Sequence, residues 1–400
     1  MVLFTVAIIP LGLPPATQAQ QSVRTPELPL FHTFRTNTQD SDLINLGPFH
    51  GEASIDVGYE FNSNAAVNNQ APVSLNEVYE DLDVNMNWII SPLNRVNLQV
   101  DGRLEENGYS NGSNELNVAI SPGSQIRLDA QIGDVTLEAF EEFSLVQDPV
   151  VDPTATGVTN LERLTNTVGL LAFAPLYRAE VGLEFDYTYS DDLSSQPEFT
   201  SLSRNSLRLG GTVGFELSPL LSYGAEASAT SNTGPGSDDV RSFSFGPFLR
   251  GRLTRLIDVD LGAGINLVDA PGTGPVLYYV SLQVRYQMSR LVQCLIGFSH
   301  DLNFSSGLDL TENNNFNLKA QFQLSRVWTV SVGPFVNVGR ALTGINAGSY
   351  TQYGVDTASV FLLSKRVSMN AEYRFAERNG DETEGSYIQH LVSFSLKYAF

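Results

Sequence analysis

Apolar side chains alternate with polar ones along most of the chain from about residue 50. Residues 54–61, residues 317–324 and the end of the chain, residues 388–400, all place an apolar side chain at every second position. A period of two is that of a β-strand, because successive side chains point to opposite faces. A strand with one apolar face and one face of Gln, Ser, Lys or Asp suits a wall between lipid and water. The pattern therefore predicts strands that span a membrane.

Eighteen segments show this alternation and are predicted to be strands. They span residues 51–62, 76–90, 95–105, 113–121, 125–141, 164–174, 177–189, 203–217, 222–229, 240–253, 257–267, 276–288, 292–301, 314–325, 327–339, 350–363, 367–377 and 386–400. The segments at 113–121 and 222–229 alternate least clearly, so sixteen strands is the alternative count. Both numbers are even, as is usual in bacterial barrels.

A short recurring motif is predicted to form tight turns between these strands. It occurs as Ile90-Ser-Pro-Leu-Asn-Arg95, Ile120-Ser-Pro-Gly-Ser124, Phe173-Ala-Pro-Leu-Tyr-Arg178, Leu217-Ser-Pro-Leu-Leu221, Leu253-Thr-Arg-Leu256, Met288-Ser-Arg-Leu-Val292, Leu324-Ser-Arg-Val327 and Leu363-Ser-Lys-Arg-Val367. The opposite connections, such as 63–75, 142–163, 190–202, 230–239 and 302–313, are longer and rich in Asn, Ser, Gly and Asp. Short turns belong to the periplasm and longer loops to the cell exterior.

The fold class predicted from these elements is all-β. No stretch approaches the roughly 18 consecutive apolar residues of a spanning helix, and otherwise only a closed barrel satisfies every backbone group in lipid. We therefore expect a single transmembrane antiparallel up-and-down β-barrel. A soluble sandwich or propeller is the rival architecture, but its strands would be shorter and its connections would not divide into a short and a long end.

Two proline residues fit this prediction poorly. Pro247 and Pro334 each follow a glycine and precede a phenylalanine inside a predicted strand. Proline cannot donate a hydrogen bond to a strand ladder. We predict a β-bulge at each position.

Composition narrows the class of protein and its compartment. The net charge of −21 makes nucleic acid an improbable partner. A single cysteine, Cys294, rules out an intramolecular disulfide framework and any Cys-rich zinc site. Residues 1–19 are predicted to be a signal peptide with cleavage near Ala19, although no Lys or Arg precedes the apolar run. Residues 20–47 are then an N-terminal periplasmic segment, and residues 48–400 form the barrel.

The alternation places many charged residues on the inner face. The predicted basic residues there are Arg95, Arg103, Arg127, Arg178, Arg204, Arg208, Arg250, Arg252, Arg285, Lys319, Arg374 and Lys397. The predicted acids are Glu77, Asp81, Asp83, Asp101, Asp129, Glu180, Glu184, Asp186, Glu216, Glu226, Asp258, Asp260 and Glu372. So many ionised groups need water, which a barrel of about sixteen to eighteen strands supplies as a channel. The charge pattern favours a pore.

The longest connection suggests how the pore could be narrowed. The third external loop, from Glu142 to Arg163, is acidic and follows Glu141. The layout resembles that of general porins, and the resemblance implies that the third loop folds into the lumen and faces a basic wall. The constriction acids would then be Glu141, Glu142, Asp148 and Asp152. The alternative is a solvated surface loop, with the wall arginines paired to wall acids.

Both ends of the barrel resemble known outer-membrane proteins. The final residues, with Tyr398 and Phe400 at alternate positions, resemble the C-terminal insertion signal of Gram-negative outer-membrane β-barrels. Residues 46–64, with Gly47-Pro48 before an alternating strand that ends in an aromatic residue and Asn, resemble the first strand of the β-barrel porin 2 group. The resemblance implies a bacterial outer-membrane location, insertion by the barrel-assembly machinery, diffusion of small solutes and a homotrimer.

The expected function is a porin-like channel for passive diffusion of small hydrophilic solutes. The alternative is a structural or adhesive barrel whose external loops bind a partner without significant conductance. Catalysis is not expected, because His32 and His50 precede or begin the barrel, whereas His300 and His390 fall on the lipid-facing register near the external rim. No cofactor or metal is predicted, since the acidic loop clusters match no EF-hand spacing.

Overall fold

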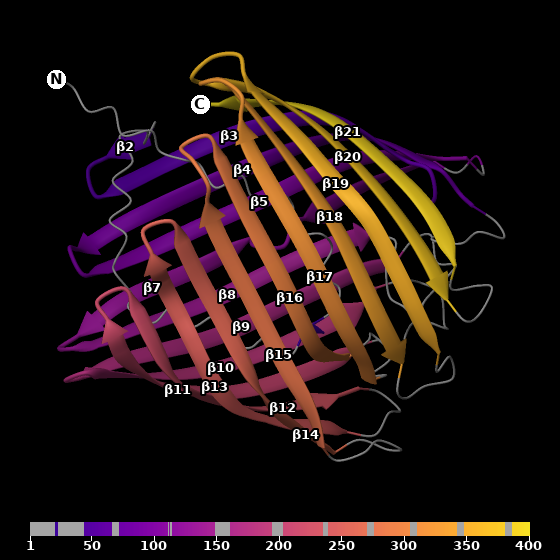
Figure 1. Cartoon of the computed structure of the whole chain (residues 1–400). Helices are drawn as coiled ribbons and strands as arrows, with labels where there is room; N and C mark the ends of the chain where they lie inside the picture. The colour runs from indigo at the N-terminus through magenta and orange to yellow at the C-terminus, as the bar shows by residue number, and fades with distance from the viewer. Residues whose placement is uncertain are drawn as a thin grey trace.

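The chain forms one closed antiparallel β-barrel of 18 strands (Figure 1). The computed structural model describes residues 21–22, 44–65, 72–110, 112, 114–148, 161–193, 203–234, 239–269, 276–304, 310–341, 348–380 and 386–400. The barrel strands are β3 (Phe49–Asn62), β4 (Leu75–Ser91), β5 (Asn94–Tyr109), β6 (Asn114–Ile120) with β7 (Gln125–Ile132), β8 (Val135–Asp148), β9 (Leu161–Leu176), β10 (Ala179–Asp192), β11 (Arg204–Ser218), β12 (Leu221–Thr233), β13 (Val240–Thr254), β14 (Ile257–Asp269), β15 (Val276–Gln287), β16 (Val292–Phe304), β17 (Leu310–Gln323), β18 (Trp328–Ala341), β19 (Ser349–Leu362), β20 (Val367–Gly380) and β21 (Tyr387–Ala399). The predicted fold class is confirmed.

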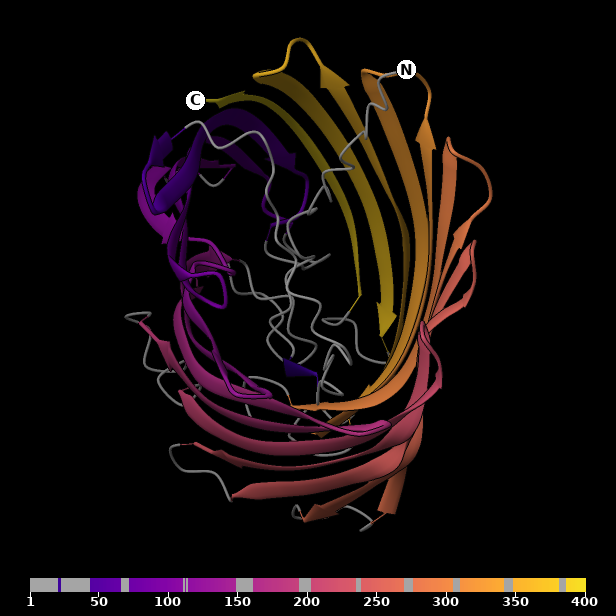
Figure 2. The same ribbon diagram turned by 90° about the vertical axis from the view of Figure 1, so that its left-hand side faces the viewer.

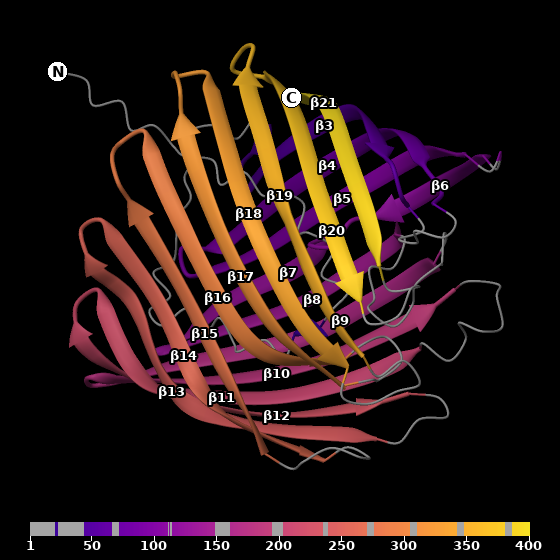
Figure 3. The ribbon, with the colours of Figure 1, turned by 45° about the vertical axis from the view of Figure 1, so that its right-hand side comes forward.

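The barrel closes where the last strand meets the first. β21 pairs with β3 from Leu391 opposite Asn62 to Ala399 opposite Ser54. The backbone N–H of Phe400 continues this seam by donating to the carbonyl oxygen of Ala53 at 2.9 Å. Figure 2 shows the strands arranged in a ring, and Figure 3 shows β21 and β3 side by side. Closure pairs both edges of the barrel sheet, which is what a hydrocarbon environment requires.

β6 and β7 are two halves of one barrel strand. β5 pairs with β6 through residues 102–108 and with β7 through residues 95–99. Between the halves, residues 121–124 lie opposite only two residues on each neighbouring strand. The extra residues form a bulge, in which Gly123 has a φ of 99°. The prediction of a tight turn at residues 120–124 is therefore wrong.

The true turn of this region lies further along the chain. β7 and β8 are joined by Gly133 and Asp134, with Ile132 opposite Val135 and a φ of 63° at Gly133. A two-residue connection that begins with glycine at positive φ is typical of β-hairpins. The single predicted strand 125–141 is thus split into β7 and the start of β8. The total stays at eighteen because the two halves of the interrupted strand count as one.

The other seven predicted turns lie where the sequence placed them. The connections at this end of the barrel are residues 92–93, 133–134, 177–178, 219–220, 255–256, 288–291, 324–327 and 363–366. Connections at the opposite end, such as 63–74 and 149–160, are mostly longer. We call these the turn end and the loop end.

The outer face of the barrel is apolar. Val57, Leu82 and Leu104 on β3, β4 and β5 expose 46%, 49% and 43% of their surface, which is the arrangement expected when lipid covers the wall. Aromatic side chains pair near the turn end, where Phe49 stacks on Trp88 with ring centroids 5.4 Å apart. Aromatic rings at the interface can place their apolar bodies in acyl chains and their polar edges among headgroups. No helix in the described part of the chain is long and apolar enough to span a membrane.

The two prolines do not produce bulges. Pro247 lies opposite Ala225 and Pro334 opposite Val355, and the pairing on both sides of each proline keeps one register. The ladder to β14 skips Gly246 and Pro247, and the ladder to β17 skips Gly333 and Pro334, but the flanking residues hold the strands in register. The bulge prediction is therefore wrong at both sites.

Two short strands precede the barrel. β2 (Ile44–Leu46) forms a hairpin with the start of β3 through Gly47, whose φ is 69°. β1 (Gln21–Ser22) pairs with Phe304 and Asn303 at the loop end of β16. The proposed signal peptide, residues 1–19, and most of the N-terminal segment lie outside the described residues.

Candidate functional site

The inner wall of the barrel carries the charged groups that the alternation predicted. Residues directly opposite each other in register point to the same side of the wall, so one inward residue fixes the face of a whole row. One such row runs from Asp56 on β3 to Asp81 on β4 and Arg103 on β5. The neighbouring row of Val57, Glu80 and Leu104 faces outward. The wall is the candidate site because its charges border the space enclosed by the ring.

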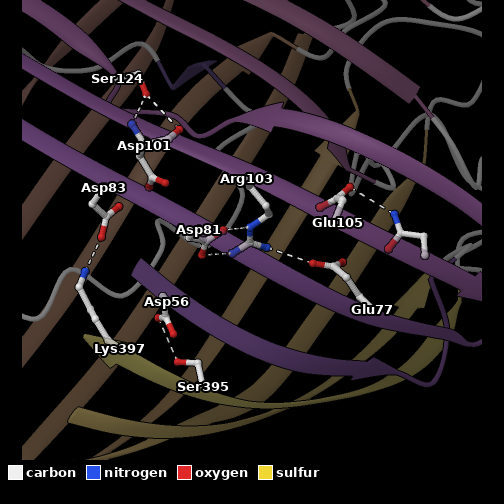
Figure 4. A network of polar contacts seen from close by, with 11 residues as sticks. Asp56, Glu77, Asp81, Asp83, Asp101, Arg103, Glu105, Ser124, Ser395 and Lys397 are labelled. Carbon is white, nitrogen blue, oxygen red and sulfur yellow. Dashed lines mark hydrogen bonds and ion pairs between the residues drawn. The ribbon is translucent and has the colours of Figure 1, made fainter. Parts of the chain in front are cut away.

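Arg103 is the centre of a polar network on the first strands (Figure 4). Its guanidinium donates to both carboxylate oxygens of Asp81, at 2.7 and 3.0 Å, and to Glu77 Oε1 at 3.2 Å. The Cζ atom lies 4.3 Å from the ring centroid of Tyr79. A fork of donors on two carboxylates and an aromatic face fixes the side chain in one geometry. The guanidinium of Arg103 is therefore engaged in contacts with residues of the inner wall.

The same network ties the closing strand to the first two strands. Lys397 from β21 donates to Asp83 on β4, which also accepts a hydrogen bond from Ser54 Oγ at 3.0 Å. Ser395 Oγ donates to Asp56 Oδ2 at 3.0 Å. Figure 4 shows the Lys397–Asp83 and Ser395–Asp56 contacts, which join β21 to β4 and to β3. The polar contacts thus support closure as well as lining the lumen.

Two further arginines are paired near the interrupted strand. Arg95 Nε lies 2.6 Å from Asp129 Oδ2, and Arg127 Nε lies 3.2 Å from Glu138 Oε1. Both pairs join neighbouring strands directly. The sequence placed Arg95, Arg127 and Asp129 on the inner face, and the register agrees.

Arginines of the predicted basic wall on β11 and β13 also pair with acids on neighbouring strands. Arg250 lies 2.8 Å from Asp260, Arg252 lies 3.1 Å from Asp258, and Arg208 lies 3.7 Å from Glu184. These contacts agree with the alternative that wall arginines pair with wall acids. The loop that would face this basic wall, residues 149–160 with Asp152, lies outside the described residues.

The remaining predicted basic residues differ in their positions. Arg204 is only 6% exposed and lies opposite Ser190. Arg285 lies opposite Asp258, and Lys319 opposite Leu295, both on the inner register. Arg178 lies in the turn before β10, because β10 begins at Ala179. It is therefore a residue of the turn end rather than of a strand wall.

The predicted acidic residues divide between the two faces. Asp83, Asp101, Glu184 and Asp186 share the inner register. Glu142 is also inward, and its Oε1 accepts a hydrogen bond from the backbone N–H of Gly123 at 3.1 Å.

Glu141 differs from the prediction. It was predicted to act as a constriction acid in the lumen, but it shares the outer face with Ile126 and Val168. Its Oε1 accepts a hydrogen bond from Asn166 Nδ2 at 2.9 Å. Glu142, which the prediction placed at the start of the third loop, belongs to β8. Asp148 is the last residue of β8. The third loop is thus shorter than the sequence suggested.

Several inward acids were not among the predicted residues. Asp56 and Glu60 on β3, Glu105 on β5 and Glu115 on β6 all lie on the inner register. The alternation of residues 54–61 contained the signal for Asp56 and Glu60. Glu105 and Glu115 were harder to assign because β5 continues to Tyr109, beyond the predicted end at residue 105, and the segment of Glu115 alternates weakly.

Tyr398, Phe400, His300 and His390 lie on the outer face, whereas His50 lies on the inner register of β3. The rings of Tyr398 and Phe400 meet edge to face, with centroids 5.0 Å apart. His300 stacks on Tyr278 at 4.0 Å and its Nδ1 lies 2.9 Å from Asn314 Oδ1, while His390 Nδ1 lies 3.0 Å from the Tyr373 hydroxyl. In the described part of the chain, no group of three or more His, Cys, Asp or Glu side chains is placed to hold a metal ion.

Comparisons with known proteins identify the fold. No protein-family model matches the sequence, and no curated protein matches it. The solved structure of OccK7 (OpdD) from Pseudomonas aeruginosa aligns with a TM-score of 0.52 and 11% identity, over 89% of this chain and 99% of that chain. OccAB3 from Acinetobacter baumannii aligns with a TM-score of 0.50 and 9% identity, over 89% of this chain and 100% of that chain.

At such low identity these likenesses show the fold alone. The chain therefore has the closed β-barrel fold of these two structures, with an apolar outer face and a charged inner face. The finer resemblance to the β-barrel porin 2 group stays an expectation.

Proposed function

We propose that the chain is a channel through which small hydrophilic solutes diffuse passively across the outer membrane. The observation that supports this most directly is the inner wall, where ion pairs such as Arg250–Asp260 and Arg103–Asp81 line successive strands. Ionised groups are costly to bury without water. A barrel of this strand number is wide enough to hold an aqueous channel. Charged walls and a wide ring together favour a conducting lumen.

The alternative function is a structural or adhesive barrel whose external loops bind a partner. Such a barrel needs a stable wall and exposed loops but no open path. The paired wall charges would serve it equally well as a scaffold. The property that separates the two functions is therefore conductance.

Single-channel recording tests the proposal. The full-length mature protein, refolded in detergent and added to a planar lipid bilayer in KCl, is expected to give stepwise increases in current. Heat-denatured protein from the same preparation is the control and should give none. Folded protein, identified by its faster migration on an unheated SDS gel, that gives no current would exclude the channel and favour the scaffold.

The route to the membrane belongs to the same proposal. We propose that residues 1–19 are removed after export and that the assembly machinery recognises the terminal strand through Tyr398 and Phe400. Phe400→Ala is expected to reduce the amount of folded protein in the outer membrane without changing the conductance of the molecules that insert. The oligomeric state, for which the resemblance implies a homotrimer, can be measured by light scattering of the detergent-solubilised protein.

A further inference from the structure

A patch of the inner wall near the loop end carries buried polar atoms that have no hydrogen-bond partner. Arg208 on β11, Asn232 on β12 and Ser242 on β13 expose only 9%, 3% and 7% of their surface. Arg208 and Ser242 both lie opposite Thr230, and Asn232 follows Thr230 by two positions on β12. All three belong to the inner register, which Arg208 shares with Asp186. We call Arg208, Asn232 and Ser242 the donor patch.

The unpartnered atoms of the donor patch are mainly hydrogen-bond donors. In the part of the chain that the structure describes, no hydrogen bond is formed by Arg208 Nε and Nη2, Asn232 Nδ2 or Ser242 Oγ. Guanidinium and amide nitrogens only donate, and buried polar atoms are rarely left unpaired. Thr230, which lies between the three, is only partly buried and borders the lumen. The patch therefore lacks acceptor oxygens at a place that a solute can approach.

The polar side chains around the donor patch are paired, so the missing partners are a local property. Thr167 Oγ1 and Thr188 Oγ1 lie 3.0 Å apart on β9 and β10. One inward row deeper, Ser244 Oγ on β13 donates to Asn266 Oδ1 on β14. An unpaired buried donor costs stability. A wall that served only as a scaffold would therefore gain from apolar residues at the three positions of the donor patch.

The charge of Arg208 is already matched by the wall. Its Nε lies 3.7 Å from Glu184 Oε2, an ion pair that is too long for a hydrogen bond, and Asp186 lies directly opposite on β10. Arg208 thus lacks acceptor atoms rather than negative charge. Hydroxyl oxygens of a sugar accept hydrogen bonds and bring no charge, whereas a carboxylate or phosphate would add a further anion beside Glu184 and Asp186.

We propose that the donor patch binds uncharged carbohydrate at the loop end of the lumen. Arg208 and Asn232 donate to oxygens of one sugar unit, and Ser242 contacts the next unit two strands away, at about twice the strand spacing of 4.8 Å. The proposal names a solute class for the proposed channel and rests on that function in one respect, because passage of the sugar requires an open lumen. Binding itself does not require passage, so the two can be tested separately.

Maltose is the probe for the test. Its binding to the full-length mature protein, in a detergent without a sugar headgroup, is measured by isothermal titration calorimetry, and its block of KCl current is measured in planar bilayers. In the variant Asn232→Ala with Ser242→Ala, we expect the dissociation constant to rise about tenfold, because hydrogen bonds to the sugar are lost. Stability in urea should not fall, since Asn232 Nδ2 and Ser242 Oγ have no partner in the described wall to lose.

The matched control is Ser244→Ala with Asn266→Ala, which removes the same residue types from a pair that is already hydrogen-bonded. It should leave maltose binding within twofold of the wild type, and gel migration before and after heating should show both variants folded. Equal weakening in the two variants, or no binding to the wild type, would overturn the donor patch. A loss of stability in the variant of Asn232 and Ser242 would also overturn it, because these side chains would then hold the wall together.

Two further outcomes separate the remaining possibilities. Gluconate, a sugar acid with one carboxylate, should bind no more tightly than maltose; tighter binding would overturn the assignment to uncharged carbohydrate. Binding of maltose to folded protein that gives no current would overturn the channel but support the donor patch. Current that maltose neither blocks nor accompanies with measurable binding would support the channel and overturn the donor patch.

Discussion

At the scale of the residue, large inward-facing side chains lie over glycines of the neighbouring strand. Tyr79 is 7% exposed, and a Cβ added to Gly58 would lie 2.2 Å from its Cζ. Phe140 covers Gly169 in the same way, at 2.2 Å. The ring fills the volume that a side chain on the glycine would take. These glycines are therefore packing residues.

Gly58→Ala is expected to lower the free energy of unfolding by about 1–3 kcal/mol, because the new methyl group must displace the Tyr79 ring. Unfolding in urea, followed by the loss of fast migration on unheated gels, measures the change. Gly102→Ala is the control, since a Cβ there meets no atom within 4 Å. Equal stability losses in the two variants would show that Tyr79 is not held against Gly58.

The inner and outer faces could be read from the sequence, but the ion pairs could not. Arg250 and Asp260 were both assigned to the inner face because the direction of a side chain follows from its place in the alternation. Their contact of 2.8 Å depends on the register between β13 and β14. Register is set by turn geometry and by packing across strands. Pairing therefore lay beyond the reach of alternation alone.

At the scale of the element, the interrupted strand shows why one motif had two structural outcomes. Residues 120–124 contain the Ser-Pro pair found in two of the true turns, but here this segment lies within a strand between β5 and β8. The backbone N–H of Asp101 donates to Ser124 Oγ at 3.0 Å, and the N–H of Phe143 donates to the carbonyl oxygen of Ser124 at 2.9 Å. These contacts come from residues distant in sequence. Local residue preferences could not reveal them.

Deletion of Pro122 and Gly123 tests this assignment. The shortened strand would place Ser121 and Ser124 opposite Asp101 and Val100, with every later side chain on its present face. We expect the variant to form a folded barrel whose free energy of unfolding differs from that of the wild type by no more than about 2 kcal/mol. Deletion of Gly133 and Asp134, the true turn, should abolish the heat-modifiable band. If deletion of Pro122 and Gly123 abolished the heat-modifiable band and deletion of Gly133 and Asp134 did not, the turn would lie at residues 120–124 as the sequence predicted.

At the scale of the whole molecule, the strand number, the two unequal ends and a closed ring were predictable, whereas the register at which the ring closes was not. Alternation over residues 50–400 indicated the number of strands, and the short motifs at regular intervals indicated that one end of the barrel has short turns. Which strands meet at the seam is a long-range property, because β3 and β21 lie at opposite ends of the sequence. Only the cost of open edges in lipid argued for a ring. The pairing of residues 54–62 with 391–399 supplies the register of that ring.

A disulfide across the seam tests the closure directly. In a Cys294→Ser background, Ser393→Cys and Glu60→Cys place two thiols on directly opposite, inward positions of β21 and β3. Opposite Cα atoms in antiparallel strands are about 4.5–5.5 Å apart, within the range a disulfide spans. Mild oxidation should therefore cross-link the pair in nearly all folded molecules. After cleavage in an external loop, the two fragments should separate on a heated gel only when reductant is added.

In the control, Ser393→Cys with Glu77→Cys, the thiols lie two strands apart, at about twice the strand spacing of 4.8 Å, and should remain reduced. Fragments that separate without reductant in the first variant would mean that the first and last strands do not meet.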